Sequence, residues 1–291
     1  MDILKLGLPA GSLQEPTLEM FRKAGYRIDL EERSYFPAID EENVECTLIR
    51  AQEIPVYVEE GILDVGITGK DWITETGVEG IKEVAELTYS RRGLRPIRLV
   101  LAVPEDSEIT GVKDLEGKKI ATELVHSTRK FLEENGVNSQ VVFSWGATEV
   151  KPPKLADAIS ELTETGSSLR ANNLRILDTI LTSTPRVVVR PDVWEDPEKR
   201  KKIENMVTLL KGALMADKMV GLKMNISEEN LKKAMEVLPA LRNPTVSRLY
   251  NEDWVAVETV VEEKNVKELI CQLKEIGAEG ILEYTINKII P

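Results

Sequence analysis

Residues 146–173 read GATEVKPPKLADAISELTETGSSLRANN. Four apolar residues between positions 155 and 162 recur at helical spacing, which predicts a helix over this segment. The helix is expected to end at the polar turn TETGSS, at 163–168, and residues 169–173 can begin a second helix. The segment therefore predicts a helix, a polar turn and another helix.

The polar turn is a candidate anion site. Thr165, Ser167 and Ser168 offer hydroxyl groups, and Gly166 lets the backbone bend. Such a turn gathers N–H groups and hydroxyls in a small space, which suits a phosphate. Upstream, the carboxylate of Asp157 can accept hydrogen bonds from sugar hydroxyls. The pair suggests a phosphorylated sugar as ligand, whereas the alternative is an ordinary capped helix start, because Ser and Thr are common N-caps.

The same stretch resembles the signature segment of the ATP phosphoribosyltransferases, which catalyse the first step of histidine biosynthesis. The resemblance implies that Asp157 lies near the ribose hydroxyls of phosphoribosyl pyrophosphate. It also implies that the 5-phosphate of this substrate binds to Thr165, Gly166, Ser167, Ser168 and Leu169. Two further segments are similar to the family, RAQEIP at 50–55 and LDVGITGKDW at 63–72.

The amino-acid composition argues against several classes of function. The chain has 291 residues, enough for two or three domains, and a formal net charge of −12 argues against general nucleic-acid binding. Cys46 and Cys271 are far apart and show no metal-ligand spacing, and His126 is the single histidine. The first residues lead into a predicted strand without a signal peptide, and no apolar run reaches the ~18 residues of a membrane span. We therefore expect a cytoplasmic protein that does not bind membranes.

The N-terminal segment offers a second candidate anion or nucleotide site. A strand is predicted over 3–8, a turn PAGSL follows at 9–13, and a helix is predicted over 14–24. The family resemblance implies that Gly11 and Ser12 lie at the active site. This chain has Ala10 where the family usually has lysine, so one cation is missing. An ordinary strand–helix turn is the alternative.

Further residues come from the resemblance. It implies that Arg50 lines the active-site cleft and that the Thr68-Gly69 turn follows a strand at the base of the cleft. The alternative for Arg50 is a surface ion pair. Arginines within 91–98 could face pyrophosphate, and they could equally be scattered surface charges. The expected ATP-binding set is therefore Gly11, Ser12, Arg50, Thr68 and Gly69.

Strands and helices continue to alternate to about residue 190, which predicts an α/β fold. We expect a two-lobed, periplasmic-binding-protein-like catalytic core with a double crossover. Lobe I would comprise residues 1–93 and 186–215, and lobe II would comprise residues 94–185. Two lobes joined in this way leave a cleft that can close and keep water from an activated sugar.

Residues 216–291 form a different predicted unit. The expected β-α-β-β-α-β order indicates a ferredoxin-like (ACT-like) α+β domain, with residues 241–249 as a loop. LPALRNPTVSRL and WVAVE resemble the regulatory domain of the long form of the family, which binds histidine as an inhibitor. The implied histidine-binding positions are Asn225, Leu241, Thr245, Ala278 and Gly280. A purely oligomerising domain is the alternative.

The implied reaction is displacement at C1 of the ribose of phosphoribosyl pyrophosphate by adenine N1 of ATP, giving phosphoribosyl-ATP and pyrophosphate. Such chemistry depends mainly on positioning and charge stabilisation. The expected catalytic residues are Asp157, Glu149 and Arg50, and Mg²⁺ would be held mainly by substrate phosphates.

The resemblance also implies an enzyme that works without a separate regulatory subunit and assembles as a homo-oligomer, a dimer or a hexamer. Two alternatives stay open at this point: a cytosolic two-lobed sensor of small molecules without catalysis, and a phosphoribosyltransferase that acts on another base.

Overall fold

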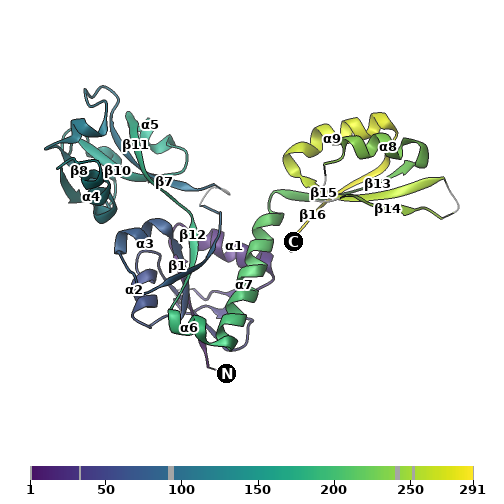
Figure 1. The fold of residues 1–291 in the computed structure, drawn as a ribbon, viewed down its shortest axis with the longest axis horizontal. Coiled ribbons are helices and arrows are strands. Elements are labelled where there is room, and N and C mark those ends of the chain that lie inside the picture. Colours follow the sequence, from purple (N-terminus) through teal and green to yellow (C-terminus); the bar gives the residue numbers. More distant parts are fainter. Residues whose placement is uncertain (1, 33, 91–94, 240–242, 251–252, 291) are drawn as a thin grey trace. The chain divides into compact units, whose positions relative to one another are not determined.

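The computed structural model describes residues 2–32, 34–90, 95–239, 243–250 and 253–290. The chain divides into two compact units (Figure 1). The first comprises Met1–Arg22 and Tyr26–Val207, and the second comprises Lys23–Gly25 and Thr208–Pro291. The first unit contains two lobes, each built on its own five-stranded sheet.

Lobe I is an α/β layer structure with strand order β4-β1-β5-β12-β6. β1, β4 and β5 are parallel, whereas β12 is antiparallel to both of its neighbours. Every residue of β5 is buried, as expected for a central strand covered on both faces. The strands are β1 (Leu4–Ala10), β4 (Val44–Arg50), β5 (Val65–Gly69), β6 (Lys82–Glu86) and β12 (Pro185–Val189), with the short pair β2 (Ile28–Asp29) and β3 (Ala38–Ile39). The helices are α1 (Gln14–Ala24), α2 (Ile54–Glu59), α3 (Lys70–Thr76) and α6 (Pro191–Glu195), and α7 (Pro197–Ala216) begins in this lobe and continues into the second unit from Thr208.

Lobe II has strand order β11-β7-β10-β8-β9. β8, β9 and β10 are parallel, and β7 is antiparallel to β10 and β11. Its core is apolar on both faces of β7, where Val100 and Leu101 are fully buried. The elements are β7 (Ile97–Pro104), η1 (Val112–Leu115), β8 (Lys119–Thr122), α4 (Val125–Glu134), β9 (Gln140–Phe143), η2 (Thr148–Val150), β10 (Ala158–Thr163), α5 (Ser167–Ala171) and β11 (Leu174–Ser183).

Two chain crossovers join the lobes. The first leads from β6 to β7, and the second leads from Ser183 at the end of β11 to Pro185 at the start of β12. On the first crossover the buried hydroxyl of Tyr89 shares a 2.7 Å hydrogen bond with Thr17 Oγ1 of α1. This topology confirms the expected two-lobed core with a double crossover. Pro185 already belongs to a lobe I strand, one residue before the expected boundary.

The expected helix over residues 155–162 is wrong, because this segment contains strand β10. Ala158, Ile159 and Ser160 are buried one after another, since β10 lies between β7 and β8 in the sheet. A short apolar run in a central strand can show the same spacing as one face of a helix. The turn after it begins α5 at Ser167, two residues earlier than expected.

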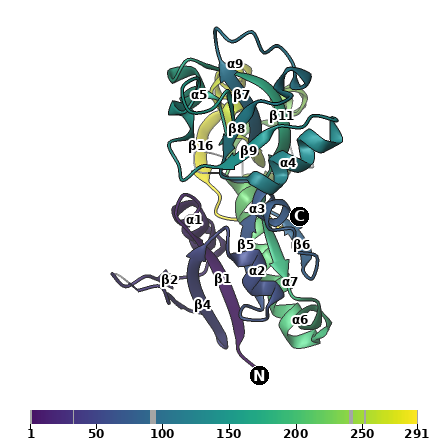
Figure 2. The same cartoon turned by 90° about the vertical axis from the view of Figure 1, so that its left-hand side faces the viewer.

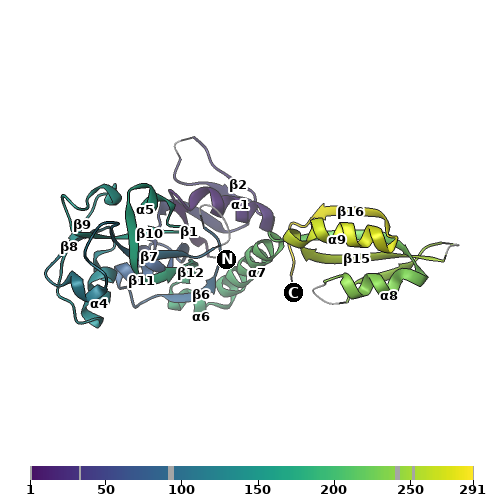
Figure 3. The same ribbon diagram turned by 90° about the horizontal axis from the view of Figure 1, so that it is seen from above.

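The C-terminal domain has the expected ferredoxin-like order, β13 (Met219–Ser227), α8 (Glu228–Val237), β14 (Thr245–Arg248), β15 (Trp254–Glu262), α9 (Glu263–Ile276) and β16 (Glu279–Thr285). Its antiparallel sheet has strand order β14-β15-β13-β16. Helices α8 and α9 lie side by side (Figure 3) and share an apolar core with β13 and β15. The expected loop over 241–249 therefore needs correction, since an exposed edge strand lies within it.

Among the residues that the structure describes, no helix combines the length and the apolar character needed to cross a membrane.

Candidate active site

The carboxyl ends of the parallel lobe I strands open onto a cavity of about 230 Å³. β1, β4 and β5 end at Ala10, Arg50 and Gly69, and ligands of open α/β sheets bind outside such strand ends. Lobe II contributes Ile97, Glu123 and Leu162, and the crossovers contribute Tyr89, Ser90, Ser183 and Pro185. From lobe I the walls contain Ala10, Gly11, Ser12, Leu13, Arg50, Ala51, Gln52, Gly69, Asp71 and Trp72.

Four of the expected ATP-binding residues meet in this cavity: Gly11, Ser12, Arg50 and Gly69. Gly11 has φ of +91°, and a Cβ atom there would lie only 3.1 Å from Arg50 Nη1. A glycine therefore fits both the positive φ and the close approach of the guanidinium.

The fifth expected ATP-binding residue, Thr68, lies elsewhere. Its side chain is fully buried, and its hydroxyl donates a 2.6 Å hydrogen bond to the carbonyl oxygen of Ala51. Thr68 is therefore not part of the cavity wall. It supports the turn that follows Arg50, because it fixes the backbone next to that residue.

The candidate phosphate turn lies at the carboxyl end of β10, directly after Leu162 of the cavity wall. Gly166 has φ of +72°, and its N–H donates to Thr163 Oγ1 at 2.8 Å. Arg170 Nη1 donates to the carbonyl oxygen of Thr165 at 3.0 Å and so links helix α5 to the turn. The exposed hydroxyl side chains are those of Thr165, Ser167 and Ser168. The residues expected to bind phosphate are therefore brought together.

Three glutamates gather at the same edge of lobe II. Glu161 is half-buried on β10, Glu123 follows β8, and Glu149 lies in η2. Burial chiefly raises the pKa of Glu161 from its ordinary 4.5 to about 7, and the charges of Glu149 and Glu123 add to the rise. A hydrogen bond with Thr148 opposes the rise. Glu161 is not among the site residues expected from the sequence, whereas a strand over residues 158–163 places it beside the turn.

Asp157 lies at the other end of β10. Its Oδ2 accepts a 2.8 Å hydrogen bond from the N–H of Lys119, and its own N–H donates to the Lys119 carbonyl at 2.9 Å. At about 3.3 Å per strand residue, the length of β10 separates Asp157 from the turn by roughly 20 Å. The expectation that Asp157 lies near the phosphate turn is therefore corrected, because a strand rises about 3.3 Å per residue whereas a helix rises about 1.5 Å.

Two of the expected cations lie in the described part of the 91–98 segment. Arg98 is half-buried and in register with Thr163 across β7 and β10, directly before the phosphate turn. Arg95 is exposed ahead of β7. Arg91 and Arg92 lie outside the described residues. Of this segment, Arg98 is the arginine that the strand pairing places next to the turn.

The expected histidine-binding positions are spread over the C-terminal domain. Asn225 and Gly280 are adjacent, since a Cβ atom at position 280 would lie 3.8 Å from Asn225 Nδ2. Thr245 is exposed on the edge strand β14, beyond β15. Ala278 is fully buried in the apolar core, which corrects its expected contact with a ligand. Leu241 lies outside the described residues.

Comparison with known proteins covers both parts of the chain. The family model for ATP phosphoribosyltransferase matches residues 50–212, and the model for the HisG C-terminal domain matches residues 216–288. ATP phosphoribosyltransferase of Thermodesulfovibrio yellowstonii is 55% identical over 289 residues, which cover 99% of each chain. The enzyme of Chlorobium luteolum is 59% identical over 288 residues, covering 99% of this chain and 98% of that one.

A solved structure supports the fold of the catalytic core. The ATP phosphoribosyl transferase (HisG:HisZ) complex from Thermotoga maritima contains a chain with 27% identity and a TM-score of 0.61. The similarity covers 72% of this chain and 99% of that chain. The chain therefore belongs to the ATP phosphoribosyltransferase family, whose members condense ATP with phosphoribosyl pyrophosphate in the first step of histidine biosynthesis.

Proposed function

We propose that this chain carries out the reaction in the 230 Å³ cavity, with each substrate held mainly by one lobe. The observation that carries the proposal is that segments after parallel strands of both lobes line one cavity. Gly11 and Arg50 come from lobe I, and Glu123 and Leu162 come from lobe II. Phosphoribosyl pyrophosphate belongs to the lobe II side and ATP to the lobe I side.

The 5-phosphate of phosphoribosyl pyrophosphate binds to the turn at the end of β10. Its partners are the backbone N–H groups and hydroxyls of Thr165, Gly166, Ser167, Ser168 and Leu169. The positive φ of Gly166 and the exposure of the three hydroxyls support this role, because the turn gathers these groups at the surface. Thr165 Oγ1 donates to Ser167 Oγ at 3.1 Å, and a bound phosphate would replace this bond within the turn. This placement agrees with the expectation from the sequence.

We assign the ribose hydroxyls to Glu161, with Glu149 beside it, and withdraw that role from Asp157. A carboxylate accepts hydrogen bonds from a vicinal diol and cannot itself bind phosphate. Glu161 lies four residues before Thr165, which places an acid and a phosphate turn at one end of the same strand. Asp157 keeps a structural role at the other end, where it holds the backbone of Lys119.

ATP is held by Gly11, Ser12, Arg50 and Gly69. The guanidinium of Arg50 is suited to phosphate oxygens, since its planar fork forms paired charged hydrogen bonds. Arg98 supplies a second cation close to the phosphate turn. These two arginines serve the triphosphate of ATP and the pyrophosphate, and together they offset the missing lysine at Ala10.

Mg²⁺ binds mainly to the phosphates of the substrates. No group of three or more His, Cys, Asp or Glu side chains in the described parts of the chain is arranged to hold a metal ion. A hard cation bound through substrate phosphates needs only one or two carboxylates in addition, and Glu149 and Glu123 fit that requirement. When bound, the ion neutralises charge on the departing pyrophosphate.

The protein's part in the reaction is positioning. Adenine N1 attacks C1 of the ribose, the bond from C1 to the pyrophosphate oxygen breaks, and pyrophosphate carries away the bonding pair. The phosphate turn and Glu161 hold the sugar, and Arg50 holds the nucleotide, so that the reacting atoms are aligned. The cations stabilise the charge that develops on the leaving group.

Titration of phosphoribosyl pyrophosphate into the double variant Thr165→Val, Gly166→Ala tests the binding site. We expect binding to be lost while the variant still unfolds cooperatively, with about 1–2 kcal/mol less stability from backbone strain at Gly166, whose φ is +72°. The variant Thr110→Val serves as a control, since Thr110 is an exposed threonine far along the sequence in the same lobe. Unchanged affinity in a folded double variant would refute the assignment.

For the C-terminal domain we propose regulation. Its match to the family's C-terminal domain supports the binding of histidine as a feedback inhibitor, at Asn225 and Gly280 together with Thr245 and Leu241. The similar Thermotoga chain comes from a complex of two proteins and matches only 72% of this chain. We infer that this enzyme needs no separate regulatory subunit, forms homodimers and hexamers, and works in the cytoplasm.

A further inference from the structure

A carboxylate of lobe I caps a helix of lobe II. Glu75 lies on α3, and its Oε1 accepts a 2.9 Å hydrogen bond from the N–H of His126. Its Oε2 accepts two more at 2.9 Å, from the N–H and from the hydroxyl of Ser127. Figure 2 shows α3 and α4 side by side where the two lobes meet. Three hydrogen bonds from one lobe thus converge on a single side chain of the other.

The helix that Glu75 caps lacks a cap of its own. α4 begins at Val125, and its N-cap residue Leu124 has no side chain that could accept a hydrogen bond. The first N–H groups of a helix have no partner within the helix, so they need an acceptor from elsewhere. A negative charge at this end is also favourable for the helix dipole. Glu75 supplies both, which makes the start of α4 depend on lobe I.

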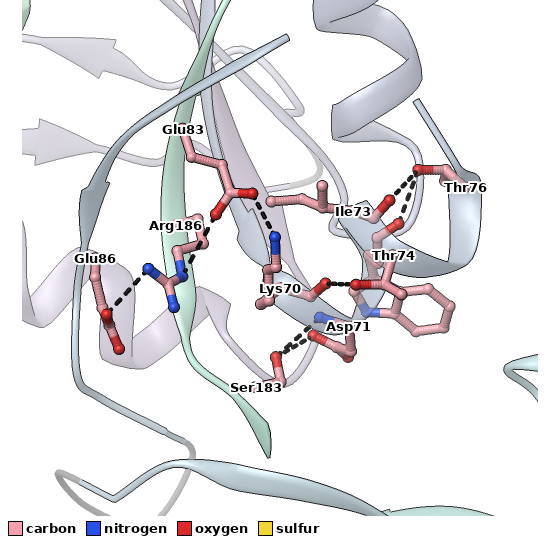
Figure 4. A network of polar contacts seen from close by, with 10 residues as sticks. Lys70, Asp71, Ile73, Thr74, Thr76, Glu83, Glu86, Ser183 and Arg186 are labelled. Atoms are coloured by element: carbon pink, nitrogen blue, oxygen red, sulfur yellow. Dashed lines mark hydrogen bonds and ion pairs between the residues drawn. The ribbon is translucent and has the colours of Figure 1, made fainter. Parts of the chain in front are cut away.

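The same short helix α3 holds lobe II at a second place (Figure 4). Asp71 is buried one helical turn before Glu75, and its Oδ1 accepts a 2.6 Å hydrogen bond from Ser183 Oγ. The N–H of Asp71 donates in turn to Ser183 Oγ at 3.0 Å. Ser183 is the last residue of β11, at the second crossover. Burial raises the pKa of Asp71, and the bond to Ser183 opposes that rise.

Ion pairs between charged side chains surround the start of α3. Lys70, at the start of α3, donates to Glu83 at 2.5 Å, and Arg186 lies 3.0 Å from Glu86 and 3.7 Å from Glu83 (Figure 4). The first pair links α3 to β6, and the two pairs of Arg186 link β6 to β12. The helix is therefore anchored in its own lobe, while its acids reach the other lobe.

Both contacts lie next to the cavity. Asp71 and Ser183 are in its wall, and Glu123 of the wall is only two residues before the first residue of α4. A change in the position of lobe II relative to α3 would therefore move Glu123 with respect to the lobe I residues of the cavity wall. The angle at which lobe II faces Arg50 is thus linked to the hydrogen bonds of α3.

We propose that Glu75 is a positioning residue for the transferase reaction. Its carboxylate holds α4 across the lobes and so keeps the sugar-binding side of lobe II aligned with the nucleotide-binding side of lobe I. Glu75 does not touch either substrate. The inference rests on the proposed placement of the two substrates on different lobes. Its consequence is that loss of the carboxylate lowers turnover and leaves the binding of phosphoribosyl pyrophosphate, a property of lobe II, unchanged.

The test compares three variants of the full chain: Glu75→Gln, Ser127→Ala and Glu133→Gln. Glutamine retains the shape of Glu75 but loses its charge and one acceptor oxygen. Ser127→Ala removes only the hydroxyl donor. Glu133 is an exposed glutamate near the other end of α4, so its variant removes one negative charge from the capped helix itself without affecting the cap.

We expect kcat to fall about ten- to a hundredfold in Glu75→Gln, because small misalignments of reacting groups cost this much. In Ser127→Ala kcat should fall about threefold, because this variant removes one hydrogen bond to a charged group. In Glu133→Gln kcat should equal that of the unmodified enzyme, because no such bond is removed. The dissociation constant of phosphoribosyl pyrophosphate should stay within about twofold in all three, as remote sites usually act independently.

Two results would overturn the proposal. Full turnover in folded Glu75→Gln would show that the cap does not position the lobes. Equal losses of phosphoribosyl pyrophosphate affinity and of turnover would show that α4 is merely damaged. If Glu75→Gln does not fold, the same comparison of turnover and phosphoribosyl pyrophosphate affinity is made with Ser127→Ala. A wrong placement of the substrates can be told apart from a wrong role for Glu75. It would appear as unchanged affinity for phosphoribosyl pyrophosphate in the variant Thr165→Val, Gly166→Ala, in which Glu75 is intact.

Discussion

The guanidinium of Arg50 lies over Gly11, so closely that a Cβ atom at position 11 would stand 3.1 Å from Arg50 Nη1. Gly11 directly follows β1, Arg50 is the last residue of the neighbouring parallel strand β4, and both line the cavity. The absence of a side chain at Gly11 therefore determines where the nearest cation of lobe I can lie. This relationship makes the turn after β1 part of the nucleotide side of the site.

Gly11→Ala should raise the KM for ATP about tenfold, because the new methyl group displaces the guanidinium and weakens a charged hydrogen bond. The control is Gly117→Ala, since Gly117 also has positive φ, +69°, but has no atom within 4 Å of its would-be Cβ. Both variants should lose about 1–2 kcal/mol of stability from backbone strain. Steady-state kinetics and thermal melts separate the two effects, and an equal rise in KM in both variants would contradict the role of Arg50.

Glu161→Gln should weaken the binding of phosphoribosyl pyrophosphate about tenfold or more, since a charged acceptor of the ribose hydroxyls is lost. Asp157→Asn should leave this affinity within about twofold and instead lower stability by about 1 kcal/mol, through the weaker bond to the N–H of Lys119. Calorimetric titration and urea unfolding measure both quantities. Stronger loss of affinity in Asp157→Asn than in Glu161→Gln would restore the original assignment of Asp157.

Stability should depend on pH through Glu161. Burial first, with the charges of Glu149 and Glu123, raises its pKa from 4.5 to about 7, against the opposing hydrogen bond with Thr148. The folded protein therefore holds the proton more tightly than the unfolded chain, and the associated stability is complete below pH 4.5 and is lost as the pH rises through about 7.

The difference in unfolding free energy between pH 5 and pH 8 should accordingly be smaller in Glu161→Gln than in the unmodified enzyme. Urea unfolding at the two pH values measures it, and Glu133→Gln provides the control for loss of one charge. An identical pH dependence in all three proteins would show that Glu161 titrates as in the unfolded chain.

Histidine inhibition should depend on Asn225. Asn225→Ala removes an amide next to Gly280 and should raise the histidine concentration for half-inhibition about tenfold, as expected when a polar ligand loses a buried hydrogen-bond partner. Turnover without histidine should not change. Lys267→Gln, an exposed position on α9, is the matched control. If histidine does not inhibit the unmodified chain, the domain has the purely oligomerising role that the sequence also allowed.

The family membership answers the two alternatives that the sequence left open. A two-lobed sensor without catalysis and a transferase for another base share the α/β core, but neither explains the match at 55–59% identity along almost the whole chain. The C-terminal match from 216 to 288 supports the same conclusion.

Most strands and helices and the polar turn after residue 163 could be predicted from the sequence, because turn residues and apolar periodicity act within a few residues of one another. The expected roles of Gly11 and Arg50 rested on the family resemblance. Strand and helix could not be told apart over residues 155–162, since a short buried run fits both periods, and this one error placed the sugar acid at Asp157.

Contacts between residues that are far apart in the chain depend on the tertiary structure. Glu161, Glu149 and Glu123 meet because three parallel strands end at one edge of a sheet. Thr68 is buried under the Arg50 turn because β5 is a central strand. Glu75 reaches α4 across 51 residues and Asp71 reaches Ser183 across 112. No local pattern carries such pairings, because the packing of whole elements brings these side chains within hydrogen-bonding distance.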